Sequence, residues 1–181
     1  VSSKPNSCTF VTSAKSNTIN GITRYYIDTQ GMSPTDNLDA KHIQQMVEFL
    51  KKWELGVNAF FIILNIQNPR FDSGIQKMIR FINEFFNNPE FWNQTGIIFT
   101  RCLPRHFDRQ VAENEYREKV VKYIKSLPKC QNLNPQLPCY FVNSVKWKTD
   151  NETKDEYIRA FAFALKFQPI PTQHLKCSFL D

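Results

Sequence analysis

The run NAFFIILNI, from Asn58 to Ile66, decides the fold class of this chain. It is almost continuously apolar over a length that suits a strand, and such runs are typical of strands that helices cover on both faces. The run is far shorter than the roughly 20 apolar residues that a membrane-spanning helix needs. It therefore predicts a buried strand in a parallel sheet.

Segments with helical and strand-like patterns alternate on both sides of this run. Before it, ITRYYID (22–28) is β-branched and aromatic, which favours a strand, and apolar positions from Leu38 to Leu55 recur at helical spacing. SCTFVTSA (7–14) alternates weakly and is interpreted as an edge strand. After it, the expected elements are a helix following Asp72, a strand TGIIFTR (95–101), a helix from Val111 to Leu127, a strand CYFVNSV (139–145) and a helix from Lys154 to Phe167.

This alternation predicts an α/β fold with a mostly parallel sheet in a three-layer α/β/α sandwich. At 181 residues the chain is most simply one domain with a substantial core. We assign residues 1–167 to that domain and residues 168–181, which are irregular in pattern, to a C-terminal extension.

The charge pattern argues against a nucleic-acid partner although the formal net charge is +6. Lys and Arg are interspersed with acids, as in ENEYREKVVKYIK (113–125), and form no basic block. Attraction to an anionic membrane surface or to a nucleotide stays open. The five cysteines are odd in number and lack C-x-x-C spacing, which favours reduced thiols and a cytoplasmic location.

Polar residues at the ends of the expected strands are the candidates for a binding site. In open α/β sheets, ligands bind beyond the carboxyl ends of the strands. The residues at these positions are Asp28 with Gly31, Asn65, Thr100 with Arg101, and Asn143 with Ser144.

The tetrapeptide Asp28-Thr29-Gln30-Gly31 fits the D-x-x-G pattern of a nucleotide-dependent switch. The Asp28 carboxylate can hold a Mg²⁺-bound water, and the Gly31 amide can donate a hydrogen bond to a γ-phosphate oxygen. The alternative is a strand that ends in a tight turn, since Asp and Gly are common in turns. The tetrapeptide alone does not decide between the two interpretations.

Further segments agree with the switch interpretation, because they follow one another along the chain in the order and at the approximate spacing of the motifs of one GTPase family. From Val1 to about Phe167 the chain resembles the AIG-type G domain of the IAN/GIMAP family, septin-like members of the TRAFAC class of GTPases. DTQG stands where that family has D-T-P-G. The other similar segments are Ser7-Cys8-Thr9, GVNAFFII (56–63), Arg70-Phe71-Asp72, GIIFTRCL (96–103) and Phe141-Val142-Asn143-Ser144.

The resemblance implies a P-loop GTPase-like fold that binds GTP or GDP together with Mg²⁺. By the same resemblance, Thr9 and Asp28 would serve the metal and Gly31 the γ-phosphate. The base would lie near Thr100, Arg101, Asn143 and Ser144.

The family's phosphate-binding loop, G-x-x-x-x-G-K-S, is absent from these 181 residues, which contain no Gly-Lys-Ser or Gly-Lys-Thr. By resemblance the loop, the strand before it and the helix after it would precede Val1. That strand would lie between RYYID (24–28) and AFFIILNI (59–66) in the sheet. Its removal would expose ladder groups on both neighbours, so we expect either a longer protein or another segment in this place.

Two further departures concern base selection and hydrolysis. Leu103 stands where such GTPases have the guanine-selecting carboxylate of T/N-K/R-x-D, which puts guanine discrimination in doubt. Met32 follows Gly31, so no catalytic glutamine is evident, and no catalytic residue is assigned. Hydrolysis is therefore expected to be slow or absent unless a dimer or partner supplies a group.

Two functions follow from these patterns. The first is a guanine-nucleotide-binding switch with slow or assembly-dependent hydrolysis, acting as a homo-oligomer or in a larger assembly, in the cytoplasm or at the cytosolic face of a membrane. The second is a degenerate, nucleotide-free G domain that serves as a structural or interaction module. The intact D-x-x-G favours the switch, whereas Leu103 and the absent loop favour the module.

Overall fold

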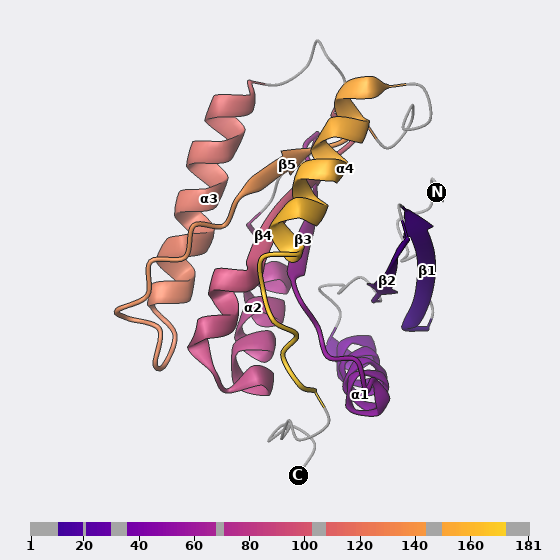
Figure 1. Ribbon diagram of the computed structural model, residues 1–181. Helices are drawn as coiled ribbons and strands as arrows, with labels where there is room; N and C mark the ends of the chain where they lie inside the picture. The colour runs from indigo at the N-terminus through magenta and orange to yellow at the C-terminus, as the bar shows by residue number, and fades with distance from the viewer. Residues whose placement is uncertain are drawn as a thin grey trace.

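The fold is organised around three parallel strands, as the computed structural model of the chain shows (Figure 1). The structure describes residues 11–19, 21–29, 36–67, 71–102, 108–143 and 150–172. Its elements, in chain order, are β1 (Ser13–Ile19), β2 (Ile22–Asp28), α1 (Asp36–Lys52), β3 (Phe60–Asn65), α2 (Ser73–Phe86), the 3₁₀ helix η1 (Pro89–Gln94), β4 (Thr95–Thr100), α3 (Arg109–Lys125), β5 (Cys139–Phe141) and α4 (Asn151–Ala164).

The described strands form two separate sheets. The order of the larger sheet is β3-β4-β5, all parallel, with Phe60 opposite Thr95 and Ile97 opposite Cys139. The smaller sheet is the antiparallel hairpin of β1 and β2. Gly21 lies in its turn with a φ of +75°, a conformation that residues with a Cβ rarely adopt.

Helices cover both faces of the three-stranded sheet. On one face, the Phe60 ring packs 4.7 Å from that of Phe86 in α2, and the Phe99 ring packs 5.8 Å from that of Tyr116 in α3. On the other face, Phe163 of α4 contacts the rings of Phe61 and Tyr140. The predicted three-layer α/β/α arrangement is confirmed.

The core is one cluster of apolar side chains drawn from α1, α2, α3 and the three parallel strands. A buried amide beside it is hydrogen-bonded: the Asn83 side-chain oxygen accepts from Trp92 Nε1 and from the Cys130 thiol, both at 3.0 Å. This pairing removes the cost of burying an amide among aromatic rings. No helix within the described ranges has the length and apolarity to cross a membrane.

Two predicted strand boundaries are wrong. The edge strand predicted at residues 7–14 lies partly outside the described residues, Val11 and Thr12 are not in a strand, and β1 instead begins at Ser13. The strand predicted at residues 139–145 ends at Phe141, and residues 144 and 145 lie outside the described residues. Val142 still continues the ladder, since its N–H donates to the Phe99 carbonyl at 2.8 Å.

Residues 168–172, the first part of the predicted C-terminal extension, fold back onto the domain. Ile170 pairs with Val57 in an isolated antiparallel bridge, and Thr172 is fully buried. Gly56 permits this contact, because a Cβ at that position would lie 2.8 Å from the Ile170 carbonyl oxygen.

Candidate functional site

The carboxyl ends of β3 and β4 lie side by side, as the sequence predicts. Asn65 is opposite Thr100 in the ladder, and the Ile66 N–H donates to the Thr100 carbonyl at 3.1 Å. The Thr100 hydroxyl donates to the Leu64 carbonyl at 3.2 Å. The Thr100 hydroxyl thus links the ends of β3 and β4 and has a structural role.

Arg101 marks a sharp turn at the end of β4. Its φ is +58°, a left-handed conformation that is uncommon for a residue with a side chain, and its side chain is partly exposed. Such backbone strain is concentrated at functional sites. The next residue returns to the sheet, because the Cys102 N–H donates to the Val142 carbonyl at 3.2 Å.

Asn143 lies beside this turn but is only 4% exposed. Its backbone N–H donates to the Thr153 hydroxyl at 2.8 Å, and that hydroxyl donates to the Asp150 carboxylate at 2.6 Å. The structure therefore brings Thr100, Arg101 and Asn143 together at adjacent strand ends. It buries Asn143, which the sequence does not reveal.

Asp28 lies apart from these residues, at the end of β2 and therefore on the hairpin. Its side chain is exposed. Three other residues of the sequence-based site, namely Thr9, Gly31 and Ser144, lie outside the described residues, as does Leu103, which stands in place of the guanine-selecting carboxylate. Of the predicted site, the structure thus places one group at the carboxyl edge of the three-stranded sheet and Asp28 on the neighbouring hairpin.

The strands β2 and β3 contact the same helix but are not paired with each other. Tyr26 of β2 packs edge-on against Phe161 of α4 at 5.4 Å, and Phe61 of β3 meets Phe163 of the same helix. The hairpin and the larger sheet are nevertheless separate (Figure 1). In the described part of the chain, β3 is an edge strand, and Ile63 on its α4 face is 58% exposed.

The opposite edge of the sheet, at β5, is closed by side chains of α4. The Glu156 carboxylate accepts from the Phe141 N–H at 3.4 Å, and Thr153 accepts from the Asn143 N–H. These acceptors satisfy donors that an edge strand otherwise presents to a neighbouring chain. The molecule thus protects one sheet edge with side chains and leaves an apolar residue exposed near the other.

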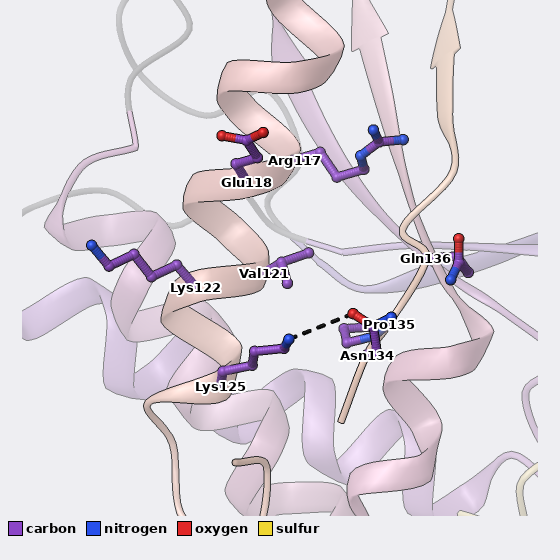
Figure 2. A pocket seen from close by; sticks show the side chains of 8 residues that line it. All are labelled: Arg117, Glu118, Val121, Lys122, Lys125, Asn134, Pro135 and Gln136. Atoms are coloured by element: carbon purple, nitrogen blue, oxygen red, sulfur yellow. Dashed lines mark hydrogen bonds between the residues drawn. The ribbon is translucent and has the colours of Figure 1, made fainter. Parts of the chain in front are cut away.

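Two hollows lie outside the predicted site. One, of about 470 Å³, lies between α3 and residues 134–136, and three basic side chains line it: Arg117, Lys122 and Lys125 (Figure 2). Another, of about 280 Å³, lies along β5. Neither includes Asp28, Thr100, Arg101 or Asn143, so the described site residues do not line either hollow.

Sequence reasoning did not single out the larger hollow. Its α3 residues follow helical spacing, with Arg117, Val121 and Lys125 four apart. That spacing could have indicated a shared helix face, but residues 134–136 belong to a loop whose position depends on the tertiary fold.

The described cysteines are buried and free, which makes them poor nucleophiles. Burial raises the pKa of the Cys102 thiol to about 11 and that of the Cys139 thiol to about 12. Because the thiolate is the reactive species, both thiols are inert at neutral pH.

The raised pKa values of these thiols predict a loss of stability as the pH rises from about 8.5 toward about 11. The thiol of an unfolded cysteine has a pKa of about 8.5, whereas in the folded protein the pKa is about 11 for Cys102 and about 12 for Cys139. Above about pH 8.5 the unfolded state therefore binds fewer protons, and the free energy of unfolding falls by up to about 1.4 kcal/mol per pH unit for each thiol. Urea unfolding at several pH values measures this slope. Replacing both cysteines by alanine should flatten it; an unchanged slope would contradict the assignment.

The described residues do not form a complete set of metal ligands. No group of three His, Cys, Asp or Glu side chains that could hold an ion occurs in the described ranges. Mg²⁺ is commonly bound by one or two carboxylates together with phosphate oxygens and water. The exposed carboxylate of Asp28 fits one such role.

Comparison with known proteins establishes the fold. No protein-family model matches the sequence. No curated protein matches it either. Among solved structures, one of the chloroplast translocon components atToc33 and psToc159 matches with a TM-score of 0.69 at 12% identity, over 90% of this chain and 72% of that chain. Toc33 from Arabidopsis thaliana in complex with Mg²⁺ and GMPPNP gives a TM-score of 0.66 at 14% identity, over 93% and 75% of the two chains.

A further structure, Toc33 in complex with GDP and Mg²⁺, gives a TM-score of 0.67 at 14% identity, over 93% of this chain and 75% of that one. At such low identity the likeness concerns the fold alone. The specific IAN/GIMAP assignment stays a prediction. The chain has a P-loop GTPase-like α/β fold, as its sequence predicted.

Proposed function

We propose that this chain is the larger part of a guanine-nucleotide-binding domain that acts as a switch. The observation that carries the proposal is the combination of a P-loop GTPase-like fold with a D-x-x-G motif whose Asp28 ends the strand β2. The related Toc33 structures contain GDP or GMPPNP with Mg²⁺, which supports the same ligands here.

The residue roles follow from position and chemistry. Asp28 would hold a water on Mg²⁺, with Thr9 as a second metal-sensing group, and the Gly31 amide would contact the γ-phosphate. Thr100, Arg101, Asn143 and Ser144 would border the base at the carboxyl edge of the sheet. Leu103 supplies no carboxylate for guanine, so we expect relaxed base selection.

The unpaired edge of β3 in the described residues supports the proposal that a further strand and helix complete the domain. β3 is an edge strand in the described residues, and Ile63 is exposed on the α4 face. A strand between β2 and β3 would pair with both, and a helix following it would cover Ile63. Such a unit would also carry the phosphate-binding loop, so we place it outside residues 1–181 of a longer protein.

Hydrolysis is proposed to be slow or dependent on assembly. No catalytic glutamine follows Gly31 in the sequence. Dimerisation is important for the GTPase activity of atToc33 and psToc159, and one of the similar Toc33 structures is that of a dimerisation-deficient mutant. A homo-oligomer or larger assembly, in the cytoplasm or at the cytosolic face of a membrane and without nucleic acid, is the matching proposal for this chain.

Replacing Asp28 by asparagine tests the switch. In the native-length protein, we expect the Mg²⁺-dependent part of the GTP affinity to fall about 10- to 100-fold, because the group that orients a metal-bound water is lost. Titration of GTP with and without Mg²⁺ measures this. Asp108→Asn is the matched control, because Asp108 caps α3 by accepting from the Gln110 and Val111 N–H groups and Asn caps equally well.

The second candidate function is a nucleotide-free interaction module. The burial of Asn143 favours it, since that side chain is shielded from a ligand at the strand ends, and Leu103 agrees. In that case the native-length protein shows no GTP binding, and Asp28→Asn and Asp108→Asn behave alike.

A further inference from the structure

The segment Gln168–Thr172, here named the strap, runs back over the turn that joins α1 to β3. Ile170 and Val57 exchange both backbone hydrogen bonds, at 3.0 and 2.9 Å. The fully buried Thr172 donates its hydroxyl to the Trp53 carbonyl at 3.0 Å. The strap is therefore fixed at two points to the residues that follow α1.

A third contact ties the start of the strap to the same turn. The Asn58 side-chain amide donates to the Phe167 carbonyl at 2.8 Å, directly before the strap begins. The Phe167 ring packs 5.0 Å from Phe163, which itself lies on the α4 face of the sheet. The end of α4, the strap and the entry to β3 thus form one hydrogen-bonded unit.

Trp53 extends this unit to the hairpin. Its indole N–H donates to the Gly56 carbonyl at 3.0 Å, and its ring stacks on Phe49 at 5.9 Å. Its ring also meets Tyr25 of β2 edge-on at 5.4 Å. Tyr25 lies three residues before Asp28. Trp53 therefore connects Thr172 of the strap to the strand that carries the D-x-x-G motif.

Side-chain contacts position the hairpin against the rest of the molecule. It does not pair with the three-stranded sheet in the described residues. Tyr25 contacts Trp53, whereas Tyr26 and Arg24 contact Phe161 of α4, at 5.4 and 4.8 Å. Without backbone pairing to β3 in the described residues, these side-chain contacts and the packing of Ile27 against the core hold β2 in place.

We propose that the strap is a conformational coupling element. When docked, it fixes Trp53 and thereby the position of β2; when released, it frees the hairpin and Asp28 with it. The coupling requires no nucleotide, because every contact in it is made between residues of this chain. It therefore goes beyond the proposed function and stands if that function fails.

Thr172→Val tests the coupling through hydrogen exchange of the β2 amides. The valine keeps the shape of the side chain but removes the hydroxyl that binds the Trp53 carbonyl. Loss of that hydrogen bond should speed exchange of the Ile22–Asp28 amides about fivefold. Thr172→Ser, which keeps the hydroxyl, should restore most of the protection.

Thr95→Val is the matched control. Thr95 is equally buried and donates its hydroxyl to the Phe91 carbonyl at 3.1 Å, away from the strap and the hairpin. It should speed exchange near Phe91 and leave the hairpin unchanged. Equal hairpin exchange in the two valine variants would overturn the proposal.

Gly56→Ala disturbs the strap at Ile170 instead of Thr172, and it provides a second test if Thr172→Val fails to fold. The added Cβ would lie 2.8 Å from the Ile170 carbonyl oxygen and 2.9 Å from the Pro169 Cβ, so the strap must move. The Ile170 amide and the β2 amides should then lose protection together. Loss of protection at Ile170 with an unchanged hairpin would also overturn the proposal.

Discussion

Replacing Glu156 by alanine is expected to lower the free energy of unfolding by about 3 kcal/mol. Glu156 is only 4% exposed, and one of its oxygens accepts from Arg159 at 3.0 Å and from Arg109 at 3.4 Å. Its other oxygen accepts from the Phe141 N–H. The substitution leaves two guanidinium groups without this partner and uncovers a donor at the edge of β5.

Urea unfolding of the variant and of Glu115→Ala separates this role from a simple surface ion pair. Glu115 pairs with Lys119 at 3.9 Å with both side chains exposed, so its removal should cost only about 0.3 kcal/mol. Glu156→Gln, which keeps an acceptor for the N–H, should fall between the two. Similar losses for Glu115→Ala and Glu156→Ala would show that Glu156 does not close the sheet edge.

Phe99→Ala is expected to cost about 4 kcal/mol, while Ile63→Ala on the neighbouring strand should cost less than about 1 kcal/mol. The Phe99 ring is fully buried between Phe141, at 5.1 Å, and Tyr116, at 5.8 Å. Ile63 is 58% exposed, so its truncation removes little buried area. The two losses of unfolding free energy differ because helices α2 and α3 cover the face of the sheet that holds Phe99, whereas the face that holds Ile63 is partly exposed.

Chemical unfolding of the 181-residue chain measures both costs. In the longer protein that we propose, an added helix would bury Ile63, and the cost of Ile63→Ala should rise to about 3 kcal/mol. A large cost for Ile63→Ala in the 181-residue chain itself would mean that this face is already covered.

The parallel sheet and its helices could be predicted because their patterns are local. The apolar run NAFFIILNI became β3 (Phe60–Asn65). Asp72, expected before a helix, caps α2 by accepting from the Ile75 N–H at 3.1 Å. Buried strands and capped amphipathic helices carry their signals in adjacent residues.

The strand predicted at residues 7–14 overlaps β1 only at Ser13 and Ala14, and the rest of β1 was missed because SAKSNTI (13–19) is mostly polar. It forms no core face of its own and is stabilised by pairing with β2. A signal was nevertheless present, since Asn20-Gly21 is the dipeptide most typical of a tight hairpin turn.

The site was predictable only in its placement at strand ends. The proximity of Thr100, Arg101 and Asn143 follows from parallel strands whose carboxyl ends meet at one edge. The burial of Asn143 depends on Thr153 in α4, and the burial of Thr172 depends on Trp53 more than 100 residues earlier. Such contacts arise from tertiary packing and leave no local pattern.

Nucleotide release from the native protein tests the central proposal most directly. The protein isolated from its source would be denatured, and the supernatant assayed for GDP and GTP while the intact mass and N-terminal sequence are determined. The proposal predicts stoichiometric GDP or GTP from a chain that is longer than residues 1–181 and carries a phosphate-binding loop. A native chain that starts at Val1 and releases no nucleotide would contradict it and leave the interaction module as the function.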